Sequence, residues 1–287
     1  MLNPDSVEEV FARHGACAIT FTDAGDRPVL EPAPGEVPLW QDTRISGLFS
    51  PAVDLGALRS DLLQSLHIDA LPAHEIEELA DRAWEREWLN DFAPMRFGTR
   101  LWVCPGDSSP DDEDAVVVRL DPGLAFGTGT HATTALCLEW LDGLDLRGAS
   151  ILDYGCGSGI LAVAALKLGG KSATGCDIDP QAITATLANA ERNGVDDRLV
   201  ATLEPGKPKR QFDIVVANIL AGPLVDLAET ISCYLRGGCL LGLSGILCEQ
   251  VEEVQAAYRP WIEFDEPAYL EQGGQTWARL TGRRNES

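Results

Sequence analysis

The chain of 287 residues is 45% apolar, enough to bury the core of one large domain or two ordinary ones. Its formal net charge of −23 repels phosphate backbones and favours basic partners, so we expect no direct binding of nucleic acid, although solubility or a salt-adapted host would explain the same charge. The sequence has no apolar run of membrane-spanning length, and its acidic start is unlike a secretory signal. It therefore predicts a cytoplasmic protein with no membrane partner. We also expect a monomer.

The first third of the chain predicts a small α+β module. Residues 1–95 hold 18 acidic side chains against 6 basic ones, a net of −12, which is about twice the charge density of the remainder. Apolar spacing and turn residues predict, in order, a helix capped by Asp5 or Ser6 and ending at Gly15, strands over 16–21 and 43–49, a helix over 54–66, and a strand over 74–79. This is the order of a ferredoxin-like βαββαβ module without its first strand.

A loop rich in glycine and threonine, DPGLAFGTGTHATT at residues 121–134, lies between a predicted strand over 115–120 and a predicted helix. Thr130, Thr133 and Thr134 stand at or near the start of this helix, where hydroxyls and free backbone N–H groups suit a carboxylate. Simple capping of the helix by Thr130 is the plainer interpretation. The glycines of the loop favour close approach of a ligand.

The chain is organised around ILDYGCGSG at residues 151–159, an apolar strand that ends in an acid and three alternating glycines, before an apolar helix over 160–168. Dinucleotide sites use G-x-G-x-x-G, so this spacing disfavours a nicotinamide-dependent dehydrogenase. S-adenosylmethionine has no phosphate and needs only a flat turn, with Asp153 placed to accept a hydrogen bond from its ammonium. Taken alone, the motif fits a purely structural glycine turn as well.

Two further polar residues end predicted strands. Asp177 lies roughly twenty residues past the glycine turn, where acids hold ribose hydroxyls, while Asp179 suits the N-cap of the next helix, although the two roles are interchangeable. Asn218 ends a later strand, at the crevice where open α/β sheets bind ligands, and capping of the following helix is its alternative role.

The rest of the chain continues the α/β alternation. Eight cysteines without a C-x-x-C pair, and four scattered histidines, predict free thiols and no metal site. The remaining predicted elements are strands over 171–176, 199–203, 212–217 and 239–244, helices over 180–193 and 246–258, and a closing hairpin of 263–270 with 276–281.

Four segments together resemble the PrmA family, which methylates the eleventh protein of the large ribosomal subunit: FGTGTHATT at 126–134, DYGCGSGIL at 153–161, DID at 177–179 and NILAG at 218–222. The match covers nearly the whole chain. The resemblance implies a class I, Rossmann-like, seven-stranded α/β methyltransferase domain with a small N-terminal α+β domain. It assigns substrate recognition to residues 1–93, an interdomain linker and leading strands to 94–125, and the methyltransferase domain to 126–287.

The resemblance also implies S-adenosyl-L-methionine as cofactor and trimethylation of lysine side chains and of the N-terminal α-amine of the ribosomal protein. The cofactor contacts that it implies are Thr134, Gly155, Asp177 and Asn218. We expect Asn218 to be catalytic, with its carboxamide oxygen accepting the hydrogens of the attacking amine. The alternative is a class I methyltransferase that acts on another amine or amide, in a protein glutamine or a small molecule. Such enzymes typically have Asn or Asp followed by Pro-Pro. In this chain Ile219 and Leu220 follow Asn218 instead.

Overall fold

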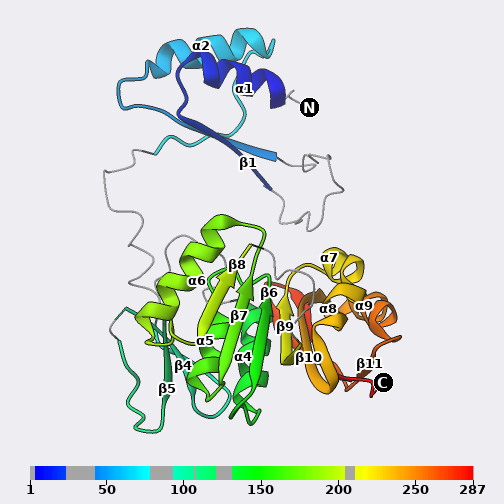
Figure 1. Cartoon of the computed structure of the whole chain (residues 1–287). Coiled ribbons are helices and arrows are strands. Elements are labelled where there is room, and N and C mark those ends of the chain that lie inside the picture. The colour runs from blue at the N-terminus through cyan, green and yellow to red at the C-terminus, as the bar shows by residue number, and fades with distance from the viewer. Residues whose placement is uncertain are drawn as a thin grey trace. The chain divides into compact units, whose positions relative to one another are not determined.

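The computed structural model describes residues 4–23, 43–77, 93–106, 108–120, 131–203 and 211–286 (Figure 1). The chain divides into two compact units, Met1–Arg82 and Ala83–Ser287. Within the described residues, no helix has both the length and the apolar character needed to span a membrane.

The first unit pairs two helices with two antiparallel strands. These are α1 (Pro4–Arg13), β1 (Ala18–Asp23), β2 (Thr43–Leu48) and α2 (Leu55–Ser65), with Ala18 opposite Leu48. Apolar side chains from the helices, Val10 and Leu58, are buried, and the ring of Phe11 meets that of Phe49 edge-on at 5.3 Å. The helices and strands therefore form where the apolar spacing predicts them.

The strand predicted over 74–79 is absent from residues 74–77, and its last two residues lie outside the described part of the chain. Ile76 is 68% exposed, so this segment buries no face of a strand. The ring of His74 forms a local hydrogen bond through Nδ1 to the carbonyl of Pro72. The described part of the first unit therefore has a two-stranded sheet.

The second unit is built on an eight-stranded sheet within the described residues, in the order β11-β13-β10-β9-β6-β7-β8, with β12 paired to β13. The five strands from β8 to β10 are parallel, and β11, β12 and β13 run antiparallel to their neighbours. The strands are β6 (Ser150–Tyr154), β7 (Ser172–Cys176), β8 (Leu199–Thr202), β9 (Phe212–Asn218), β10 (Leu235–Leu247), β11 (Ile262–Phe264), β12 (Ala268–Gln272) and β13 (Gln275–Arg284).

The chain leaves β6 for β7 and β8 and then returns to β9 on the other side of β6. The carboxyl ends of β6 and β9 therefore flank a topological switch point, where open α/β sheets bind their ligands. The helices of this unit are α4 (Ala132–Asp142), α5 (Ile160–Lys167), α6 (Pro180–Arg192), α7 (Ala221–Asp226), α8 (Ala228–Cys233) and α9 (Val251–Tyr258), with a 3-10 turn at Cys248–Gln250. This turn begins after a longer β10, so the helix predicted from residue 246 starts later than expected.

Alternate residues of the central strands enter different apolar cores on the two faces of the sheet. Ile151 and Val216 point into the core that holds α4, α5 and α6, while Leu152 and Val215 point into the core that holds α7, α8 and α9. This follows from the two-residue period of a strand. A parallel sheet covered on both faces explains why these strands read as continuous apolar runs.

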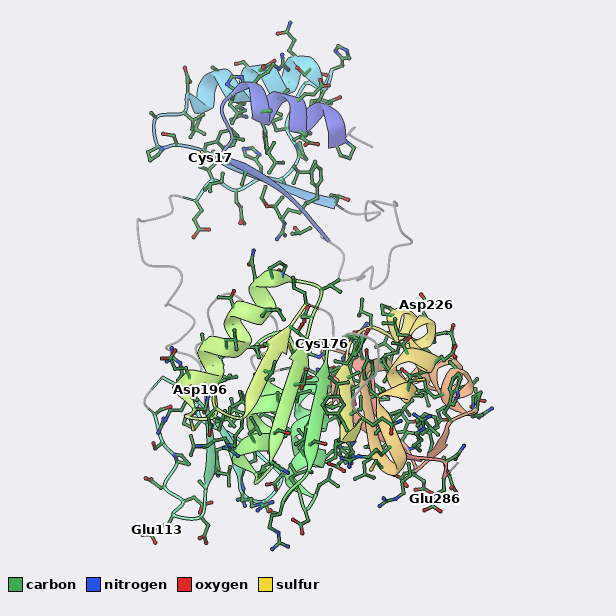
Figure 2. The ribbon with its side chains drawn as sticks, in the orientation of Figure 1. Cys17, Glu113, Cys176, Asp196, Asp226 and Glu286 are labelled. Carbon is green, nitrogen blue, oxygen red and sulfur yellow. The ribbon has the colours of Figure 1, made fainter. Side chains whose placement is uncertain are left out.

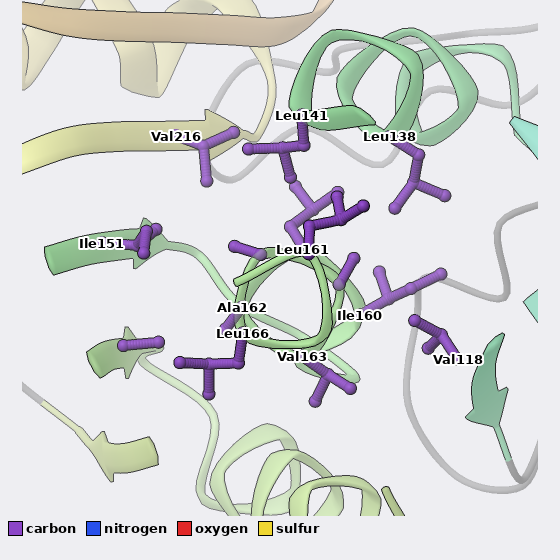
Figure 3. Close-up of a cluster of buried hydrophobic side chains, with 14 of the residues drawn as sticks. Val118, Leu138, Leu141, Ile151, Ile160, Leu161, Ala162, Val163, Leu166 and Val216 are labelled. Atoms are coloured by element: carbon purple, nitrogen blue, oxygen red, sulfur yellow. The ribbon is translucent and has the colours of Figure 1, made fainter. Parts of the chain in front are cut away.

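Helix α5 is buried on every side from residue 160 to residue 166, as its apolar sequence ILAVAAL predicts. Figure 3 shows its side chains between Ile151 of the large sheet, Leu138 of α4 and Val118 of a second sheet. That second, three-stranded sheet comprises β3 (Met95–Phe97), β4 (Leu101–Pro105) and β5 (Val116–Leu120). The helices α4, α5 and α6 thus lie between two sheets.

The turn between β3 and β4 is tied to the end of α4 by Asp142, whose side chain is almost fully buried. Its Oδ2 accepts hydrogen bonds from the backbone N–H of Thr99 at 2.6 Å and from the Thr99 hydroxyl at 2.9 Å, and Oδ1 meets Arg100 Nε at 3.3 Å. These donors hold the pKa of Asp142 below its usual range even though burial acts to raise it. Exposed acids such as Glu113, Asp196 and Asp226 lie at separate points on this unit (Figure 2).

Candidate active site

The glycine turn after β6 is hydrogen-bonded to the end of β7. The backbone N–H groups of Gly155 and Cys156 both donate to the carbonyl of Cys176, at 2.8 and 3.0 Å. Gly155 has φ +75°, and a Cβ at this position would lie 2.3 Å from Cγ2 of Ile219. A side chain at Gly155 is therefore excluded by both conformation and space, and the turn stays flat beside the segment that follows β9.

Asp153 lies at the end of β6, directly before this turn, and is only 1% exposed. Its Oδ2 accepts a hydrogen bond from the N–H of Ala162 at 3.1 Å, whereas Oδ1 is buried with no hydrogen-bond partner among the described residues. Burial raises the pKa of Asp153 to about 7, and the negative charge of Asp177 adds to the rise. An unpaired buried carboxylate oxygen is costly, and a cationic group such as an ammonium would satisfy it.

Asp177 and Asp179 have distinct positions after β7. Asp179 is the N-cap of α6, because its Oδ1 accepts from the N–H of Gln181 at 2.8 Å. Asp177 accepts from the N–H of Gly157 at 2.9 Å and of Asp179 at 3.0 Å, one bond on each carboxylate oxygen. Each oxygen keeps a free lone pair, so Asp177 remains able to accept hydrogen bonds from ribose hydroxyls.

Between these two acids, Ile178 is 95% exposed. An apolar side chain this open at the edge of a polar site offers a surface for a flat ring such as adenine. We did not expect a site role for Ile178 from the sequence, although an apolar residue between two loop acids is a usable signal.

The structure brings Asn218 and Thr134 together from segments 84 residues apart. The Asn218 Nδ2 donates to the Thr134 hydroxyl at 3.2 Å, and Thr134 is 3% exposed on the first turn of α4. With the amide nitrogen engaged, the carboxamide oxygen of Asn218 remains as an acceptor. Helix α7 begins with Leu220 as its N-cap, so Asn218 does not have the capping role that was its alternative.

The start of α4 differs from the prediction in two ways. Its N-cap is His131, whose Nδ1 accepts from the N–H of Thr133 at 3.4 Å, and not Thr130, which lies outside the described residues. The N–H of Ala132 donates to the side chain of Gln272, and that of Thr134 donates to the carbonyl of His131. These first backbone N–H groups are therefore not free for a ligand carboxylate, as the sequence had suggested.

The threonine and glycine residues at 126–130 lie outside the described part of the chain. His131 and Gln272 were both missed by the sequence analysis. Histidine is not among the favoured N-cap residues, and Gln272 reaches α4 from 140 positions away along the chain. Among the described residues, no three His, Cys, Asp or Glu side chains come together as a candidate metal site.

The chemistry of these groups matches the parts of S-adenosylmethionine. An acid with an unpaired oxygen suits its ammonium, a second acid suits its ribose, and a flat glycine turn separates them at the switch point. Fold and site together define a class I S-adenosylmethionine-dependent methyltransferase.

Comparison with known proteins narrows this class. The chain matches the family "Ribosomal protein L11 methyltransferase (PrmA)" over residues 2–285. It is 53% identical to proteins named ribosomal protein L11 methyltransferase from Klebsiella pneumoniae (strain 342) and Escherichia coli (strain K12 / DH10B), over 99% of this chain and 96% of each relative. A crystal structure of ribosomal protein L11 methylase from Lactobacillus delbrueckii subsp. bulgaricus, 31% identical, superposes with a TM-score of 0.62 over 68% of this chain and 100% of that one. The chain belongs to the PrmA family.

Proposed function

We propose that this protein transfers methyl groups from S-adenosyl-L-methionine to lysine side chains and the N-terminal α-amine of ribosomal protein L11. The relatives that carry this substrate in their names match the chain from end to end. The structural observation that best supports the reaction is the contact between Asn218 and Thr134, because it joins the two segments most specific to the family at the switch point of the sheet. Trimethylation is the extent of reaction that we propose.

The protein's task is to present a neutral amine in line with the methyl group. A free lysine has a pKa of about 10.4, so it must lose a proton before it can attack. We propose that, in the first two transfers to each amine, the carboxamide oxygen of Asn218 accepts a hydrogen of the amine and so directs the lone pair, while Thr134 fixes the orientation of the amide through Nδ2. The cofactor supplies the electrophilic methyl group on a sulfonium.

The cofactor is held by groups on three segments. Asp153 and the turn at Gly155 would receive the amino-acid end, and Asp177 the ribose. Ile178 would pack on the adenine. The first backbone N–H groups of α4 would not bind the carboxylate of the cofactor, because they already have hydrogen-bond partners.

The remaining assignments follow the family. We propose that residues 1–93 recognise the ribosomal protein, that 94–125 connect and begin the catalytic part, and that 126–287 bind the cofactor and carry out transfer. The net charge of −12 over residues 1–95 suits a basic partner. We further propose a cytoplasmic monomer that does not bind nucleic acid or membranes directly.

Two measurements test these proposals separately. S-adenosylhomocysteine should raise the melting temperature and NAD should not, which tests the cofactor. Transfer of labelled methyl groups to L11 should be lost when its amines are first blocked by acetylation, which tests the acceptor. Label that persists on blocked L11 would favour the alternative of an amide acceptor such as glutamine.

A further inference from the structure

The hairpin of β12 and β13 holds the first two turns of α4 through three side chains. Gln272 accepts from the N–H of Ala132. The ring of Trp277 meets that of His131 edge-on, with the ring centroids 4.6 Å apart. Arg279 donates from Nη1 to the carbonyl of Leu136, one turn further along the helix.

The hairpin has the geometry needed to place these side chains. Gly273 and Gly274 have φ of +62° and +74°, which is the pattern of a tight two-residue turn of type I′. The turn fixes Gln272 opposite Gln275 and Leu270 opposite Trp277. A one-residue slip would turn Gln272 and Trp277 to the other face of the hairpin, so its register determines these contacts to α4.

The first turn of α4 leads directly to the candidate active site. Thr134 is the third residue of the helix, and its hydroxyl accepts from Asn218 Nδ2. The first four backbone N–H groups of the helix are all satisfied, those of Thr134 and Ala135 by the carbonyl of His131. Among these four groups, the N–H of Ala132 bonds to a residue outside the helix and its cap. Within the described part of the chain, the bond to Gln272 is therefore the one external hydrogen bond of the backbone N–H groups of this turn.

We propose that Gln272 and Trp277 are positioning residues for cofactor binding: they fix the first turn of α4 and thereby place Thr134 against the Asn218 amide. The inference rests on the function proposed above. Neither side chain needs to touch the cofactor. Their effect is to reduce the motion of two residues that do, so that less conformational freedom is lost on binding.

The test replaces Gln272 with methionine, which keeps the length of the side chain but has no oxygen to accept the bond. Gln275→Met is the matched control, because Gln275 lies across the same turn and, among the described residues, no side-chain hydrogen bond joins it to α4. Gln272→Glu is the rescue variant, because its carboxylate accepts the same N–H and suits a helix N-terminus. Amide hydrogen exchange at Ala132, affinity for S-adenosylhomocysteine by calorimetry, and melting temperature are measured for all three.

We expect Gln272→Met to speed exchange at Ala132 and to raise the Kd for S-adenosylhomocysteine about threefold to tenfold, the range for one lost hydrogen bond. Gln275→Met should stay within about twofold of the wild type, and Gln272→Glu should recover most of the affinity. Trp277→Leu, which removes the ring contact to His131, should weaken binding in the same direction.

Faster exchange with unchanged or tighter binding would overturn the inference, because Gln272 would then stabilise the helix alone or stand in the way of the ligand. Unchanged exchange at Ala132 would overturn it too. Failure of the wild type to methylate L11, with the Gln272 effect on affinity intact, would instead contradict the proposed substrate and leave the positioning role standing.

Discussion

Asp153 gives the sharpest test of the site's electrostatics in the absence of any ligand. Burial raises its pKa to about 7 in the folded protein, against about 3.9 in an unfolded chain. Between these values the native state keeps a proton that the unfolded state has lost, so the free energy of unfolding falls as the pH rises from about 4 to about 7. Above pH 7 both states are ionised and the penalty is constant.

The size of the effect follows from the shift. A pKa raised by about three, at about 1.36 kcal/mol each, lowers the free energy of unfolding by about 4 kcal/mol in all. About 3 kcal/mol of this loss occurs between pH 5 and pH 8. Asp153→Asn removes the titration and keeps an oxygen that can accept from Ala162. The difference in unfolding free energy between variant and wild type should therefore shift by about 3 kcal/mol in favour of the variant over this pH range.

Urea unfolding at the two pH values, followed by tryptophan fluorescence, measures this difference. The neighbouring thiols of Cys137 and Cys176 do not interfere, since burial raises the pKa of each to about 12. Asp142→Asn is the matched control. This buried acid has a lowered pKa, so it is ionised at both pH values and its substitution should change the free energy of unfolding by the same amount at each. A difference for Asp153→Asn that does not change with pH would refute the reasoning.

Three other substitutions test the site and the fold. Asn218→Ala should reduce methyl transfer by at least about a hundredfold while changing the melting temperature little, because the residue is half-buried and its proposed role is to direct the amine; near-normal turnover would discard that role. Gly98→Ala should cost about 3 kcal/mol of stability in denaturant unfolding, because φ is +71° and the new Cβ would lie 2.4 Å from Asp142 Oδ2. Gly148→Ala, with φ +78° but open space, should cost only about 1 to 2 kcal/mol, and equal losses would argue against the contact.

Local patterns predicted most of the catalytic fold. The glycine turn and Asp179 as the cap of α6 are both present, because each is set by neighbours in sequence. The parallel strands are present as well, as the alternation of predicted strands and helices indicated. The family resemblance pointed to both Thr134 and Asn218, and the structure places them in contact. Whether they bind the cofactor remains a prediction.

The misses have physical causes. The sequence of residues 74–79 is typical of a strand. A strand forms where one face is buried against other elements, but Ile76 is exposed. Thr130 has a better capping side chain than His131, yet the chain starts the helix one residue later. Gln272 could not be found from the sequence, because its partner is 140 residues away and only the folded hairpin brings them together.

The most direct test of the function is the intact mass of ribosomal protein L11 after incubation with this protein and S-adenosylmethionine, followed by peptide mapping. We expect a ladder of added methyl groups on lysine side chains and the N-terminal amine, absent with Asn218→Ala. Unmodified L11, in the presence of a protein that still binds S-adenosylhomocysteine, would contradict the proposed substrate.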